Sequence, residues 1–321
     1  MTGSSASTVG VEERRRQAPR LLPVWLCLVV GAGTATAGLL PWLVTGLRLP
    51  LQNLWAAQTR PEQMPLVLLP FSQYAIILLI GVLVPGGVAA GLLARAVRAH
   101  LSRWGAAAVL AGALAVQVLA LVQTTRVVRA GLQDRSESLL YLAVLVCVAT
   151  LSVVVGVLAG ILVAGAPPAA AVVGLSVGAL ALGPWLRGLL VPFGTVDVAP
   201  ATIALVSALR WVPPVLVGAA VAWSGLRTVG RVAAAVVGLL LVWLVPALTT
   251  AISSSAGSRV LAHRPTEMAR YAAEVLVAAA TTPALVLPPL VVTVLVAGAG
   301  ILGRGLRARR RGDDRRVEAQ P

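Results

Sequence analysis

Apolar runs of 18 or more residues recur along this 321-residue chain and restrict its fold more than any other feature. Each run is long enough to cross the ~30 Å hydrocarbon core of a bilayer as an α-helix. The strands of a membrane barrel would instead alternate in polarity over about ten residues, and no such segment occurs in the sequence. We therefore predict an all-α, polytopic membrane bundle.

Eight candidate spans follow from the apolar runs and the polar residues between them. They cover residues 21–47, 66–94, 105–125, 139–164, 169–190, 202–226, 232–252 and 271–303. Only "GAPP" at 165–168 separates the fourth span from the fifth, so these two must be antiparallel neighbours. The composition agrees, because 12% of the residues are charged, against about 25% in soluble domains.

The arginines set the predicted orientation, because cytoplasmic loops of membrane proteins carry an excess of basic residues. All 26 basic residues are arginine, and 16 of them lie on the side of the N-terminus if there are eight spans. Both termini are then cytoplasmic, with a basic segment at 1–20 and an Arg-rich tail at 304–321. The first span also resembles a secretory signal that ends in "ATA" at 35–37, but its apolar run continues to Leu47 and is too long for one.

The net charge of +15 is better explained by topology than by nucleic acid. We expect the tail to contact anionic lipid headgroups, with a docking role for a protein partner as the alternative. The Ala-, Val-, Leu- and Gly-rich composition is typical of a GC-rich bacterial genome, so the expected location is a bacterial plasma membrane.

Four pairs of similar segments, in the same order, predict that the chain is built twice. "PWLVTGLRLP" at 41–50 resembles "PWLRGLLVP" at 184–192, and "QTTRVVRAG" at 123–131 takes the place of "LTTAISSSAG" at 248–257. The other two pairs are 91–110 with 225–237 and "SESLLYLAVLV" at 136–146 with "TEMARYAAEVLV" at 266–277.

The predicted four-span halves are 21–165 and 166–303, and an even number of spans in each makes the repeat parallel. Chance similarity between Ala/Val/Leu-rich helices is the alternative.

Ionisable residues in or near the spans are the candidate functional groups, because lipid disfavours charge. The candidates for contact with a substrate or a lipid headgroup are Arg210, Glu274, Glu137, Glu267 and Arg187. The two arginines can instead reach the headgroups along the bilayer surface. Glu137 and Glu267 can face positive helix ends, or they can form a paired acidic site between the halves. Glu274 can pair with Arg270 one turn earlier.

No catalytic, metal-binding or cofactor-binding set converges in the sequence. The G-x-S-x-G pattern at 174–178 lies inside an apolar span, and His100 and His263 fall on opposite sides of the membrane. We therefore expect no enzyme activity, no metal and no cofactor. The same glycines, with "GVAAG" at 87–91 and "GVLAG" at 156–160, favour close helix packing through small residues.

Two classes of function remain open. A transporter or permease-like protein for an uncharged or lipidic substrate is favoured by the duplicated halves, the many prolines and the apolar interior. A non-catalytic membrane scaffold or assembly partner in the cell envelope is favoured by the lack of charges at the middle of the spans. An intramembrane enzyme is disfavoured, because no nucleophile, base or metal set comes together.

Overall fold

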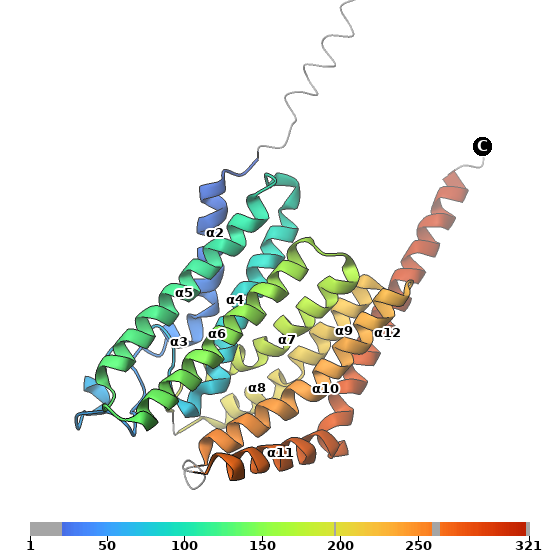
Figure 1. Cartoon of the computed structure of the whole chain (residues 1–321). Coiled ribbons are helices and arrows are strands. Elements are labelled where there is room, and N and C mark those ends of the chain that lie inside the picture. The colour runs from blue at the N-terminus through green and yellow to red at the C-terminus, as the bar shows by residue number, and fades with distance from the viewer. Residues whose placement is uncertain (1–20, 196, 259–263, 319–321) are drawn as a thin grey trace, which may run out of the picture.

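The structure is a computed structural model that describes residues 21–195, 197–258 and 264–318. It is a bundle of helices, and no strand occurs in the described residues (Figure 1). The longer helices are α2 (Val24–Gly38), α4 (Ile76–Ala96), α5 (Gly105–Gly131), α6 (Ser136–Gly165), α7 (Pro168–Leu190), α8 (Pro200–Leu209), α9 (Val212–Ser224), α10 (Val229–Gly257), α11 (Pro265–Thr281) and α12 (Pro283–Glu318). The predicted basic segment at 1–20 and His263 lie outside the described residues.

Seven helical segments in the described part of the chain are long and apolar enough to span a membrane. They cover residues 73–96, 105–131, 136–165, 168–190, 200–224, 229–257 and 283–307. α2 is a shorter apolar helix of 15 residues, followed after Leu39 by α3 (Leu40–Leu43). The predicted count of eight spans therefore depends on α2.

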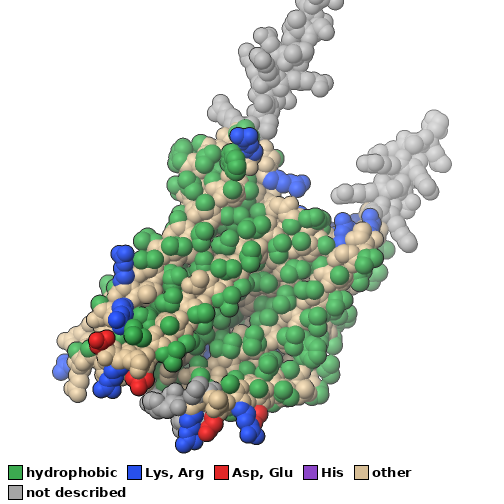
Figure 2. All heavy atoms as spheres, viewed as in Figure 1, with side chains coloured by type: hydrophobic (Ala, Val, Ile, Leu, Met, Phe, Trp, Pro, Cys, Tyr) green, Lys and Arg blue, Asp and Glu red, His purple; other side chains and the backbone are tan. Residues whose placement is uncertain are grey.

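Charged side chains gather at the two ends of the bundle, with a hydrophobic band between them (Figure 2). The described chain enters at residue 21 and α12 finishes at the same end, which we call the terminal end (Figure 1). The opposite end, which carries α11 and the α5–α6 connection, is called the loop end. Arginine-rich ends and an apolar middle are the surface that a membrane-spanning bundle requires.

Glycines hold α4 and α6 at close distance, as the sequence predicts. Gly87 lies against the backbone of Gly156, and Gly91 lies against the backbone of Gly160. A methyl group at either position of α4 would overlap main-chain atoms of α6. The two predicted small-residue motifs therefore pack directly on each other.

The chain before α4 is extended, so the predicted span 66–94 begins too early. Ser72 starts the short helix η2 (Gln73–Ala75) by accepting a hydrogen bond from Tyr74 N at 3.3 Å, and α4 follows at Ile76. Pro70 disfavours a helix that starts at residue 66, because proline in a helix interior lacks the N–H donor of the helical hydrogen bond. Residues 47–71, here called the plug, instead fold back into the loop end of the first half.

The last residues of the plug are mostly buried and are held by hydrogen bonds. Leu69 and Phe71 are 0% exposed and pack with Ile76 of α4 and Leu142 of α6. Thr124 Oγ1 of α5 accepts a hydrogen bond from Leu69 N at 3.0 Å. Gln123 accepts from Leu68 N at 3.0 Å and donates to Leu66 O at 3.0 Å. The loop end of the first half is thus closed by the protein's own chain.

The helices of the two predicted halves pack in the same pairwise pattern. In the first, α2 contacts α4 and α5, α4 contacts α5 and α6, and α5 contacts α6. In the second, α7 contacts α9 and α10, α9 contacts α10 and α12, and α10 contacts α12. By these contacts α2, α4, α5 and α6 correspond to α7, α9, α10 and α12.

The predicted span 271–303 begins too early, because two separate helices cover these residues and only the second is long enough to span a membrane. α11 ends at Thr281, Thr282 is extended with ψ 108°, and α12 begins at Pro283. A residue before proline is driven out of the helical region by contact with the proline ring, which explains the break. α11 packs on α10 and lies across the loop end of the bundle (Figure 1). Its position and its amphipathic sequence are those of a helix lying in a membrane interface.

Candidate functional site

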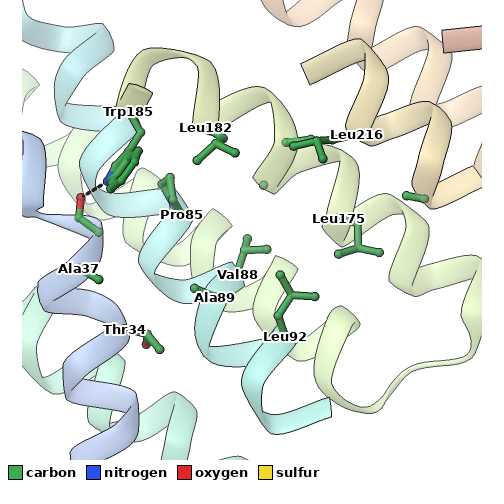
Figure 3. Close-up of a pocket in the computed structure, with 14 residues that line it drawn as sticks. Thr34, Ala37, Pro85, Val88, Ala89, Leu92, Leu175, Leu182, Trp185 and Leu216 are labelled. Carbon is green, nitrogen blue, oxygen red and sulfur yellow. Dashed lines mark hydrogen bonds between the residues drawn. The ribbon is translucent and has the colours of Figure 1, made fainter. Parts of the chain in front are cut away.

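A cavity of about 390 Å³ lies between the two halves (Figure 3) and is open to the surface on one side, where Leu92 and Leu216 are exposed. Its walls come from α2 and α4 of the first half and from α7 and α9 of the second. These four helices are two corresponding pairs in the packing pattern. A space of this size, bounded by both halves, falls within the range of small-molecule sites in proteins.

The lining of this central cavity is almost wholly apolar. It consists of Thr34, Ala37, Gly38, Pro85, Val88, Ala89, Leu92, Leu175, Gly178, Ala179, Leu182, Trp185, Leu216 and Ala220. The Thr34 hydroxyl donates to Gly31 O at 2.7 Å within its own helix. Trp185 Nε1 of α7 donates to Gly38 O of α2 at 2.9 Å (Figure 3). Both side-chain donors in the wall are already used, so the cavity favours an apolar occupant.

Small residues and one large one shape this space. Ala89, Gly178 and Ala220 leave room where longer side chains would meet, since each ends at Cβ or has none. Trp185 lies at one end of the cavity and Leu92 at the other (Figure 3). Sequence reasoning missed this site, because it searched for charges in the spans and the cavity contains none.

Arg210 lies between α8 and α9 and lines a second cavity of about 350 Å³. Its guanidinium stacks over the ring of Trp211, with Cζ 4.7 Å from the ring centre. Arg210 lies within the apolar segment 200–224, which corresponds to the predicted sixth span, at the break between its two helices. The Arg210 side chain is exposed, and all residues that line this cavity come from the second half.

Arg187 lies in the last turn of α7 and lines a shallow, open hollow of about 800 Å³. Asp197 and residues of α8 line the same hollow. Arg187 and Arg210 therefore line different spaces and do not form one site.

The three predicted acids line none of these cavities. Glu137 is exposed in the first turn of α6, whose N-cap is Arg135. Glu267 pairs with Arg264 at 3.2 Å, and Glu274 pairs with Arg270 at 3.0 Å, both within or next to α11. Among the described side chains no ion pair or hydrogen bond joins Glu137 to the other two. The similar segments 136–146 and 266–277 also have different positions in the structure. Glu137 lies at the start of the spanning helix α6, whereas Glu267 lies at the start of α11.

Arg95 at the end of α4 joins the two halves at the terminal end. Its Nη1 donates to Val163 O at 2.7 Å and to Ala166 O at 3.2 Å, two carbonyls at the α6–α7 turn. Its guanidinium also stacks over the ring of Trp223 in α9, with Cζ 5.0 Å from the ring centre. A basic side chain at the C-terminal end of a helix is a favourable cap. The sequence shows Arg95 only as one of several arginines that set topology.

Ser176 of the G-x-S-x-G pattern is buried in α7 and donates to Val172 O at 2.8 Å. Gly174 and Gly178 lie against Ala159 and Val88, so this motif packs helices, as the sequence predicts. The part of the chain that the structure describes contains no group of three His, Cys, Asp or Glu side chains able to hold a metal.

The residues that the structure describes therefore form a helical bundle with seven apolar helical segments that suit a multi-pass membrane protein, and an apolar cavity lies between its halves. Comparison with protein-family models, with curated proteins and with solved structures gave no match.

Proposed function

We propose that this protein is a permease-like membrane protein that takes an uncharged or lipidic molecule into its central cavity. The observation that carries the proposal is the apolar cavity between α2 and α4 on one side and α7 and α9 on the other. A polar or charged substrate without an apolar part would lose its hydration there without gaining hydrogen-bond partners.

The repeated packing pattern supports this function. We propose that the two halves are a tandem parallel repeat with both termini in the cytoplasm of a bacterial cell. In many transporters the substrate site lies at the interface between such repeats, and relative motion of the repeats exposes the site to each side in turn. Attachment of a membrane-impermeant thiol reagent to cysteines introduced at 98 and 267 tests the orientation, because only the second should react in intact cells.

Transbilayer lipid movement tests the central cavity directly. The purified full chain is reconstituted into liposomes that contain fluorescent phosphatidylcholine or phosphatidylglycerol, and dithionite bleaches the outer leaflet. We expect the bleached fraction to exceed one half with the native protein. Ala89→Trp fills the cavity and should return bleaching to about one half.

Ala111→Trp is the matched control, since Ala111 lies on the exposed face of α5. It should behave like the native protein. Bleaching that stays at one half for the native chain with both lipids, or that Ala89→Trp leaves unchanged, would contradict a lipidic substrate.

A scaffold role is the second candidate, and α12 favours it. Thr293 is the only buried residue among the described side chains of α12, and Gly298 and Gly303 have open space around them. An apolar helix with an uncovered small-residue face can pair with a helix of another protein. Photocrosslinking from position 298 in cells tests this role, and recovery of the chain only as itself would argue against it.

A further inference from the structure

The second cavity differs in chemistry from the central one. It lies in the second half among α7, α9, α10 and α12. The side chains in its wall that carry polar groups are Arg210, Trp211 and Thr249. Six prolines contribute to its wall: Pro184, Pro213, Pro214, Pro246, Pro288 and Pro289. It therefore combines a rigid, mostly apolar wall with one positive charge.

The corresponding space in the first half is occupied by the plug. There, Leu69 and Phe71 fill the volume between α4, α5 and α6, which correspond to α9, α10 and α12. Thr124 of "QTT" in α5 binds the plug backbone through its Oγ1. Thr249 of "LTT" in α10 has the same place in the motif and lines the second cavity. In the second half, the corresponding helices thus surround a cavity that no segment of the described chain fills.

Arg210 has no carboxylate partner among the described side chains. The two ion pairs there are Arg264–Glu267 and Arg270–Glu274, both at or in α11. Its guanidinium is positioned over Trp211, which leaves the N–H groups free to turn toward an anion. A guanidinium matches the geometry of a carboxylate or a phosphate.

We propose that the second cavity binds an anionic amphiphile, with its carboxylate or phosphate on Arg210 and its apolar chain along the proline-lined wall. This site is separate from the central cavity and does not depend on the function proposed for it. A fatty acid and a phospholipid share this chemistry, and the experiment distinguishes them.

Photolabelling with a diazirine-bearing palmitic acid tests the site on the purified full chain in phosphatidylcholine nanodiscs. We expect labelled peptides from α9, α10 and α12, and about tenfold less labelling for Arg210→Gln, since a charge-assisted hydrogen bond is lost. Arg210→Lys should keep part of the labelling. Ala284→Trp, which fills the cavity, should abolish it.

Two variants serve as controls. Arg187→Gln removes an exposed arginine that lines another hollow, and Ala89→Trp fills the central cavity. Both should label like the native chain. Unchanged labelling in Arg210→Gln, or its loss in Ala89→Trp, would overturn the proposal.

Competition identifies the source of the anion. Oleate or dioleoyl phosphatidic acid should displace the probe, and whichever is more effective names the class of ligand. Methyl oleate has the chain without the charge, and inorganic phosphate has the charge without the chain. If either of these competes as well as oleate, the site does not require both features and the proposal fails.

Discussion

The loop ends of the two halves are closed in different ways although their helices pack alike. In the first half the plug places Leu69 and Phe71 among α4, α5 and α6, and Thr124 holds its backbone. In the second half the same region is a cavity of about 350 Å³ beside Arg210, with α11 lying across the end of the bundle. The same helical arrangement can therefore enclose either a filled core or a cavity, depending on whether a chain segment enters it.

Phe71→Ala should produce the largest loss of stability in this comparison. Phe71 is 0% exposed, and removing a buried aromatic ring costs about 3 kcal/mol or more through lost contacts and the remaining hole. Leu285→Ala on the wall of the second cavity should change stability by less than about 1 kcal/mol, because Leu285 is 62% exposed. Unfolding in mixed detergent micelles, followed by circular dichroism, measures both.

Gly91→Leu should have the next largest effect. The side chain would overlap the backbone of Gly160, so α4 and α6 must separate, at a cost of about 2 to 3 kcal/mol. Gly298→Leu in α12 is the matched control, since no atom lies near the place of its new side chain. Equal losses in the two variants would show that the first half is no more tightly packed than the second.

The loss of stability in Thr124→Val and in Thr249→Val should differ by less than in the two comparisons above. Thr124 is buried, and valine leaves Leu69 N–H without its acceptor, at a cost of about 1 to 2 kcal/mol. Thr249→Val should be close to neutral, because Thr250 also donates to Pro246 O, at 2.8 Å. Hydrogen exchange at Leu69, measured by mass spectrometry, should rise in the first variant alone. Slow exchange in Thr124→Val would mean that the plug does not depend on this bond.

The sequence predicts the parts of the fold that depend on local pattern. Apolar length indicates the long helices, and the glycines at 87, 91, 156 and 160 indicate the close approach of α4 and α6. Apolar residues continue on both sides of Pro283, so the sequence indicates a proline within one span and does not show that a separate helix ends before it. Polarity alone does not distinguish a helix in the interface from the first turns of a span.

The candidate sites were harder to predict, for a physical reason. The central cavity arises where small residues of four helices face one another, and no residue in it carries a charge that marks it. Arg210 is a candidate from the sequence because a charged residue within an apolar segment is unusual. The sequence does not show that the cavity beside Arg210 is empty, because this depends on the position of residues 47–71 in the first half.

The Arg95 contacts restrict how the halves can move against each other. Two residues, Ala166 and Pro167, connect α6 to α7, and Arg95 ties the carbonyls at this corner while it stacks on Trp223. A rocking motion of one half against the other would pivot at this corner, so the largest separation would occur at the opposite end of the bundle. Each cycle would break and remake the hydrogen bond from Trp185 to Gly38, together with other contacts between the halves such as the packing of Gly188 against Leu78.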